Sequence, residues 1–127
     1  MLLLILFALF FVVLQTKTIK VTADELIENY KSNVAAADSK YLNQKIEISG
    51  TANTLVQLGG KDNFLELQSK NEQLKIYCLL PNTELVESAA LITAGTSVNI
   101  HGKCLGLRRI NPDDTSEIIY ITTESFK

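Results

Sequence analysis

The sequence predicts a small, mainly β domain in which five short strands close a barrel. Between residues 45 and 126, short segments alternate apolar and polar side chains with a period of two, which is typical of strands that bury one face. A single stretch with helical character, residues 83–92, interrupts these strands after the third one. The resulting order, β-β-β-α-β-β, is that of the five-stranded Greek-key barrel known as the OB-fold.

The composition is that of one globular domain preceded by an apolar segment. The chain has 127 residues, of which 46% are hydrophobic and 20% charged, and its net charge is −2. All 12 basic and 14 acidic side chains lie at or beyond Lys17, so the domain itself is mildly acidic. Proteins that bind phosphate backbones usually carry a basic stripe, so this slightly negative net charge counts against general nucleic-acid binding.

Residues 1–15 are expected to be a signal or anchor segment. Residues 2–14 are apolar throughout, which suits the core of a signal peptide better than a membrane span of about 20 residues. No basic residue precedes this run and no small-x-small cleavage motif follows it, so three alternatives stay open. They are an uncleaved membrane anchor, a cleaved export signal and a buried helix. No cysteine follows the run, which excludes a bacterial lipoprotein anchor.

A polar linker, residues 16–21, is expected to join this segment to the domain at residues 22–127. Thr22 and Glu25 match a capping box, in which the hydroxyl of the first residue accepts from the amide of the second. Four apolar residues follow at helical spacing: Leu26, Ile27, Tyr30 and Val34. We expect an amphipathic helix of about three turns that closes one end of the barrel with its apolar side.

The alternation also assigns which side chains point into the barrel. In the first strand Ile46, Ile48 and Gly50 share one face, and the glycine suits the bend that lets this strand serve both sheets. Turn residues at 59–63 and 69–72 separate the first three strands. The remaining strands are expected at residues 64–68, 74–80, 98–104 and 117–123.

Both cysteines should point inward. Cys78 and Cys104 are in phase with the apolar residues of the third and fourth strands. Two alternatives follow: a disulfide between these strands, which requires Cα atoms within about 7 Å, or two buried and unreactive thiols. A metal site is not expected, because the single histidine, His101, faces the other way and no CxxC spacing exists.

The sequence carries no recognisable catalytic motif. It contains no GxSxG, no HExxH and no glycine-rich phosphate loop between a strand and a helix. His101 has no partner that the sequence nominates as an orienting carboxylate or nucleophile, and we expect it to face solvent. We therefore expect a protein that is not an enzyme and that needs no cofactor.

A ligand site is expected where OB-folds bind, across the second and third strands and the loops beside them. The candidate residues are Lys61, Phe64, Lys75, Tyr77, Arg108 and Arg109. Aromatic rings and cations together could stack on bases or sugars and hold phosphates. Tryptophan is absent, however, and acidic residues dilute the positive field. We expect an unknown protein, peptide or glycan partner, with single-stranded nucleic acid as the alternative and a purely structural barrel as the third.

Four segments resemble the tRNA_anti-like family of small bacterial OB-fold proteins: residues 21–26, 36–41, 46–50 and 102–106. The resemblance covers about residues 20–126. It implies an OB-fold and no established reaction, and it implies a place in the bacterial cell envelope, either exported or membrane-anchored through the N-terminal segment and facing outward. Members often carry a third cysteine in the last strand, where this chain has Thr122, Thr123 and Glu124.

Overall fold

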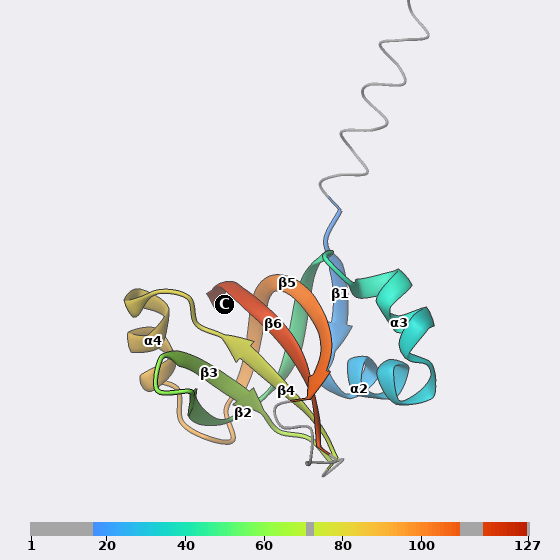
Figure 1. Cartoon of the computed structure of the whole chain (residues 1–127). Coiled ribbons are helices and arrows are strands. Elements are labelled where there is room, and N and C mark those ends of the chain that lie inside the picture. The colour runs from blue at the N-terminus through green and yellow to red at the C-terminus, as the bar shows by residue number, and fades with distance from the viewer. Residues whose placement is uncertain (1–16, 71–72, 110–115, 127) are drawn as a thin grey trace, which may run out of the picture.

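A computed structural model describes residues 17–70, 73–109 and 116–126 (Figure 1). Its elements in chain order are β1 (Ile19–Thr22), α2 (Ala23–Ser32), α3 (Val34–Tyr41), β2 (Lys45–Leu58), β3 (Asp62–Leu67), β4 (Leu74–Leu79), α4 (Thr83–Ala90), β5 (Ser97–Arg109) and β6 (Glu117–Phe126). The expected signal or anchor segment, residues 1–15, lies outside the described residues. Within them, no helix has the length and apolar character that a membrane span requires.

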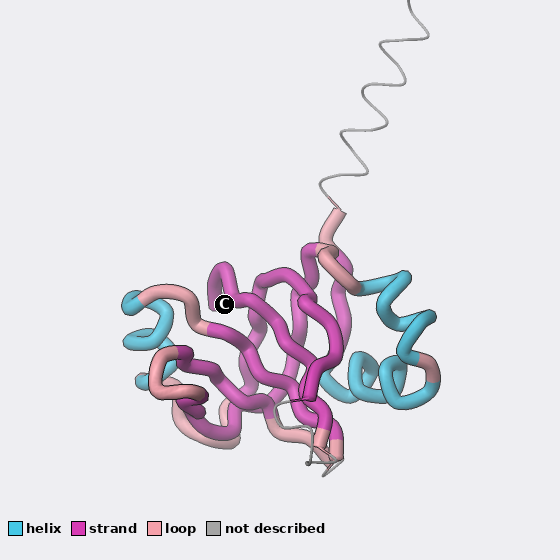
Figure 2. Tube along the Cα trace, in the orientation of Figure 1, coloured by secondary structure: helices cyan, strands magenta, loops and turns pink. Residues whose placement is uncertain are grey.

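Five strands close the predicted barrel. β2 pairs antiparallel with both β3 and β5, β3 pairs with β4, and β6 pairs antiparallel with β5. The parallel pair β4–β6 completes the cylinder. β2 can serve both halves because it pairs with β5 up to Thr51 and with β3 from Ala52 onward. Figure 2 shows the strands as one central body, with α2 and α3 on one side and α4 on the other. The OB-fold is confirmed.

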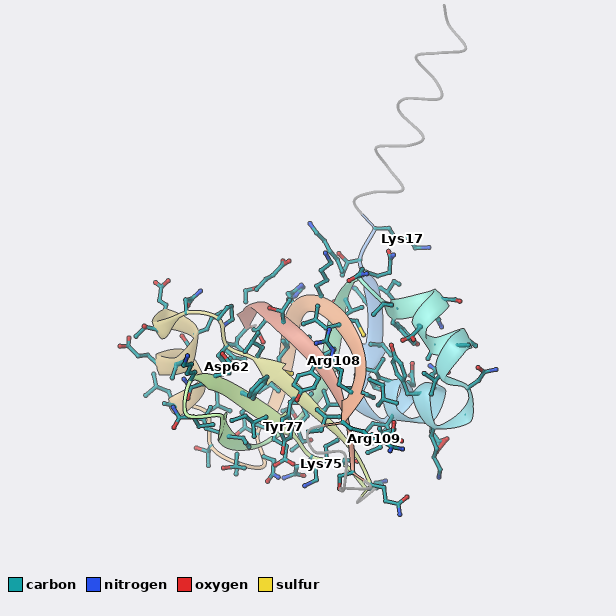
Figure 3. All side chains as sticks on the ribbon, in the orientation of Figure 1. Lys17, Asp62, Lys75, Tyr77, Arg108 and Arg109 are labelled. Atoms are coloured by element: carbon teal, nitrogen blue, oxygen red, sulfur yellow. The ribbon has the colours of Figure 1, made fainter. Side chains whose placement is uncertain are left out.

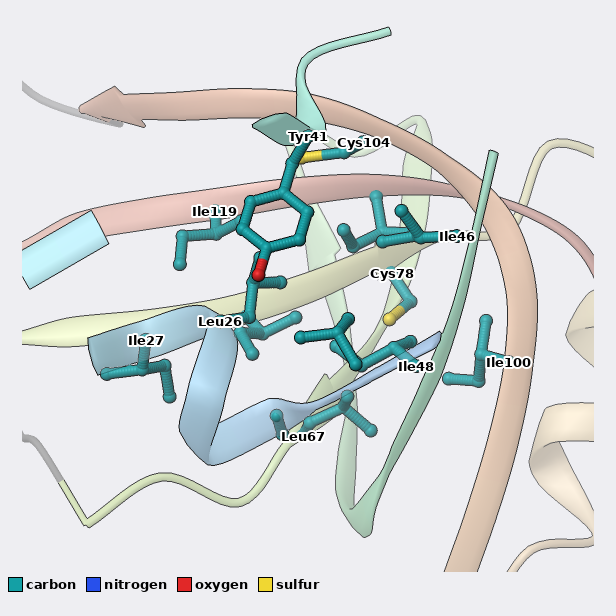
Figure 4. Packing of buried hydrophobic residues seen from close by; sticks show 14 of the residues in the cluster. Leu26, Ile27, Tyr41, Ile46, Ile48, Leu67, Cys78, Ile100, Cys104 and Ile119 are labelled. Carbon is teal, nitrogen blue, oxygen red and sulfur yellow. The ribbon is translucent and has the colours of Figure 1, made fainter. Parts of the chain in front are cut away.

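The barrel interior is filled by the side chains that the period of two assigned to it. Ile46, Ile48, Ile76 and Ile100 are each 0% exposed. Figure 4 shows how side chains from the strands and from α2 meet in this core. Burying one such aliphatic side chain contributes about 1.5–3 kcal/mol, so this core is the main source of the barrel's stability.

The expected leading helix is two helices. As predicted, the Thr22 hydroxyl accepts a hydrogen bond from the Glu25 amide at 3.1 Å and begins α2. The helix ends at Asn33, whose extended backbone stops it and whose side chain caps α3 by accepting from the Ala36 amide. Val34 is therefore 43% exposed and not part of the apolar stripe. The other stripe residues pack into the barrel core: Leu26, Ile27 and Tyr30.

The stretch expected to be a linker contains a strand. β1 pairs parallel with β2, with Ile19 opposite Ile46 and Thr22 opposite Ser49. Val21 is buried and Ile19 packs against the core, while the intervening Lys20 is exposed. Two of these four residues are apolar, and their alternation with Lys20 and Thr22 is that of a short edge strand.

Candidate functional site

The ligand face predicted across the second and third barrel strands lies on the outer surface of β3 and β4, and β6 continues it. It carries a second apolar cluster, separate from the barrel core, whose members are Phe64, Tyr77, Ile118, Val56, Leu58, Leu79 and Tyr120. Phe64 and Tyr77 lie on the expected face, but they are only 5% and 7% exposed. Stacking on a ligand requires exposed rings, but the neighbours of both residues on this curved face cover them.

Three aromatic rings meet on this face. The ring centroids of Phe64 and Tyr77 are 5.8 Å apart, and those of Phe64 and Tyr120 are 5.5 Å apart with an edge-on arrangement. Tyr120 belongs to β6 and reaches the site because the parallel β4–β6 register places it opposite Tyr77. Sequence reasoning missed Tyr120 because it considered only the second and third strands. The alternation of the last strand could have identified Tyr120. It lies between Ile119 and Ile121, which point into the barrel, and so it points outward.

A groove with a volume of about 450 Å³ opens beside these rings. It is lined by Leu58, Gly59, Asp62, Phe64, Leu79, Leu105, Arg108, Arg109 and Tyr120. Figure 3 labels Asp62 at one end of this face and Arg108 and Arg109 at the other. The groove thus combines an apolar and aromatic floor with two guanidinium groups and one carboxylate, which are chemically suited to a planar, polar ligand.

Ion pairs neutralise part of the positive charge expected here. The Nζ atom of Lys75 lies 3.7 Å from Oε1 of Glu66, whose Oε2 accepts a 2.9 Å hydrogen bond from the side-chain amide of Asn53. Nη2 of Arg109 lies 3.9 Å from Oε1 of Glu117. Arg108 is exposed and makes no ion pair within the part of the chain that the structure describes. It is therefore the cation in the groove most available to a ligand.

Both tyrosines of the site keep their protons at neutral pH. Burial raises the pKa of Tyr77, and the nearby Glu66 carboxylate and Tyr120 raise it further. Burial also raises the pKa of Tyr120, against a smaller lowering by the Arg108 guanidinium. Both phenols therefore remain neutral hydroxyl groups that can donate a hydrogen bond.

The structure does not bring every predicted residue together. Phe64, Arg108 and Arg109 line the groove. Tyr77 packs behind Phe64, and the Lys75 side chain is held by Glu66. Lys61 lines a different hollow, between the β2–β3 turn and the start of α4. That turn needs left-handed backbone at Gly59 and Gly60, with φ of 63° and 71°.

The two cysteines are buried, as predicted, and both are free thiols. Cys78 and Cys104 both lie opposite Ile121, on the two sides of β6, so a whole strand separates them. Neighbouring strands are about 4.8 Å apart, which puts the two Cα atoms well beyond the roughly 7 Å limit of a disulfide. Burial raises the pKa of Cys78 to about 12 and also raises that of Cys104. In the structure both cysteines are therefore buried free thiols, as in the second alternative.

His101 is less exposed than expected and has an acidic neighbour. Its Nε2 atom lies 3.2 Å from Oε1 of Glu47, and Nζ of Lys20 lies 3.9 Å from the other carboxylate oxygen. These three residues come from β5, β2 and β1 and sit in one cross-strand row. Among residues 17–70, 73–109 and 116–126, no group of three or more histidine, cysteine or acidic side chains could hold a metal ion.

Several solved structures share this architecture. A candidate nucleic acid-binding lipoprotein of Klebsiella pneumoniae matches with a TM-score of 0.55 and 13% identity, over 84% of this chain and 92% of that one. A candidate aspartyl-tRNA synthetase of Leishmania major matches with a TM-score of 0.55 and 10% identity, over 87% of this chain. The asparaginyl-tRNA synthetase of Entamoeba histolytica matches with a TM-score of 0.51 and 17% identity, also over 87%.

The extent of these matches differs. The chain spans nearly all of the Klebsiella protein but only 20% and 23% of the two synthetases, so it corresponds to one domain of those enzymes. At these identities the likeness shows the shared fold alone. No curated protein matches the sequence. The tRNA_anti-like family matches it over residues 3–113, which include β1 to β5 and all three described helices. The chain belongs to the tRNA_anti-like family.

Proposed function

We propose that this protein is a non-catalytic binding module whose outer groove takes a short segment of single-stranded nucleic acid. The observation that supports this best is the position of Arg108 beside the edge-on pair of Phe64 and Tyr120. Aromatic rings stack on bases of any sequence, and a guanidinium group binds phosphate or stacks on a base in turn. The fold neighbours named for nucleic-acid binding and tRNA chemistry support the proposal as analogy only.

The geometry of the groove limits the affinity that it can reach. Phe64 is largely covered, so the groove offers stacking surface for one or two bases rather than a long strand. Two stacked bases and one phosphate contact supply roughly 5–6 kcal/mol, equivalent to a Kd of about 40–200 µM. The ion pairs of Lys75 and Arg109 reduce the electrostatic contribution further. We expect weak, salt-dependent binding with little sequence preference.

Fluorescence anisotropy with a labelled hexathymidine at 20 and 150 mM salt tests this proposal. We expect Arg108→Ala to weaken binding about fivefold or more, because it removes the groove cation that makes no ion pair with the described residues. Lys31→Ala, a matched loss of charge on α2, should leave the affinity unchanged. Equal effects of the two variants, or no binding at millimolar protein, would remove nucleic acid as the ligand.

A protein, peptide or glycan partner is the second candidate. The observation in its favour is the near-neutral charge of the groove, where Asp62 lines the same groove as the two arginines and Glu117 pairs with one of them. A benzoylphenylalanine placed at Leu58 would report directly on the occupant of the groove in cells. Crosslinks to protein would favour this second candidate, and crosslinks to RNA or DNA would favour the first.

We also infer that the protein is associated with the cell envelope through residues 1–15. Two observations support this inference. Residues 2–14 are apolar throughout, and one fold neighbour, the Klebsiella protein, is described as a lipoprotein. Cell fractionation with sequencing of the mature N-terminus separates the alternatives. An intact Met1 in the membrane fraction indicates an anchor, and a new terminus indicates export. Cleavage within Ile19–Thr22 would remove β1, so we expect any cleavage to precede Ile19.

A further inference from the structure

One end of the barrel carries a concentration of exposed lysines. Its members, called the basic end below, are Lys17, Lys20, Lys40, Lys45 and Lys103. We infer that the basic end rests on an anionic membrane surface and so orients the domain on the membrane. This inference builds on the proposed envelope association and is tested separately from it.

The fold brings these lysines together from distant parts of the sequence. Lys45 and Lys103 are directly opposite each other in the β2–β5 register. Lys20 lies one strand further along, opposite Glu47. Lys40 sits over the ring of Tyr41, and the short connection after Tyr41 runs beside β5, where the Asn43 amide donates to the Cys104 carbonyl. Figure 3 shows Lys17 at the end of the molecule away from Lys75 and Arg109.

Folding alone does not account for this arrangement. Two like charges directly opposite on neighbouring strands destabilise the pairing, as Lys45 and Lys103 do. Of the acidic residues nearby, Glu47 is shared between Lys20 and His101, and Asp38 accepts a hydrogen bond from Tyr30. Glu124 is exposed on the neighbouring β6. Cations therefore outnumber acids here, although the whole chain has a net charge of −2.

The neighbouring sequence identifies the kind of partner. The apolar run ends at Leu14, three residues before Lys17, and three extended residues reach at most about 10 Å. If the run lies in a membrane, the basic end is thus held within about one Debye length of the headgroups, where anionic lipids attract lysine. Stacking surface for a nucleic-acid strand is small here, since the ring of Tyr41, over which Lys40 lies, is only 1% exposed. An anionic leaflet fits better.

Amine footprinting of the full chain in lipid vesicles tests the inference. Labelling is compared in phosphatidylcholine vesicles and in vesicles with 30% phosphatidylglycerol. We expect Lys45 and Lys103 to react at least threefold more slowly in the anionic vesicles, and 0.5 M salt to abolish the difference. Lys31 and Lys70, which line a separate hollow between α2 and the β3–β4 turn, should label equally in both.

Two double variants test whether the protection from labelling depends on the basic end. The double variant Lys45→Gln and Lys103→Gln should remove most of the protection of Lys17, whereas Lys31→Gln with Lys70→Gln should preserve it. Equal labelling in the two kinds of vesicle would overturn the inference, and so would protection by hexathymidine in place of anionic lipid. Flotation with neutral vesicles reports on the N-terminal segment separately. If the chain does not float there, protection by the anionic vesicles still supports the basic end, and its absence still refutes it.

Discussion

Replacing Gly102 by alanine is the sharpest test of the closed barrel. Gly102 lies on β5 and faces into the barrel, where β5 crosses β6 at a bulge. A Cβ atom there would meet the carbonyl oxygen of Thr122 far inside contact distance and would lie 3.2 Å from Cγ2 of Ile121. The oxygen belongs to the backbone of the neighbouring strand, so no side-chain rotation can relieve the clash.

The loss of stability follows from the backbone movement that the added methyl group requires. β5 and β6 have to separate locally, which overpacks the core by about 1–3 kcal/mol and weakens about two backbone hydrogen bonds worth 0.5–1.5 kcal/mol each. The sum is about 2–6 kcal/mol, a large share of the 5–15 kcal/mol that stabilises a typical domain. At roughly 4 °C per kcal/mol, the midpoint of thermal unfolding should fall by more than about 8 °C.

Gly50→Ala provides the matched control, because the same methyl group meets only side chains there. Its Cβ would lie 3.1 Å from that of Ala23 and 3.3 Å from Cδ1 of Leu67, and we expect a loss of about 1 kcal/mol. Urea unfolding of residues 17–127, followed by circular dichroism, measures both variants. If Gly102→Ala costs less than 1 kcal/mol, or no more than Gly50→Ala, then β5 and β6 are not packed as described.

Three further predictions concern buried groups. Cys78 and Cys104 should react with Ellman's reagent only on unfolding, and two thiols should be counted in denaturant without reductant; a count of zero would mean a disulfide. Burial raises the pKa of Cys78 from 9.0 to about 12, so unfolding is favoured once the unfolded thiol ionises. The stabilisation is complete below pH 9 and falls by up to about 1.4 kcal/mol per pH unit between 9 and 12; a flat urea midpoint over this range would contradict it. Tyr30→Phe removes a 2.9 Å hydrogen bond to Asp38 and should cost about 1 kcal/mol in urea unfolding, whereas no loss would mean that water replaces it.

The barrel interior could be predicted from the sequence because it depends on local alternation. The phase of Ile76 with Cys78 and of Ile100 with Cys104 assigns all four to the core, and all are buried. The glycine-rich turn, the helix after the third strand and the Thr22 cap are likewise local signals, each determined by a few adjacent residues.

The rest depends on which distant strands become neighbours. Tyr120 joins the site only through the parallel β4–β6 pairing, and that same pairing places Ile121 between the two cysteines. No local pattern reveals either arrangement. The ion pair of Lys75 with Glu66 likewise depends on adjacent β3 and β4, although both residues belong to one predicted hairpin. The dilution of positive charge on the outer face could therefore be predicted from the sequence, but the individual ion pairs could not.

The break at Asn33 and the strand β1 were missed for other reasons. Apolar residues continue at helical spacing up to Val34, which predicts one unbroken helix. The structure shows a break, because the Asn33 side chain accepts from the Ala36 amide and begins a new helix there. Residues 19–22 form a strand because β2 offers a free edge where β3 has left it. For β1 a tertiary contact decides the conformation, whereas the break at Asn33 depends on this local helix cap.

We propose that the outer face of β3, β4 and β6 is the ligand-binding surface of this barrel. Amide chemical-shift mapping during a titration of residues 17–127 with hexathymidine tests it most directly. We expect the largest shifts at Phe64, Leu79, Arg108 and Tyr120, which line the groove. Shifts centred on α2 around Lys31 would contradict this placement of the site, and no shifts at millimolar ligand would remove nucleic acid as the ligand.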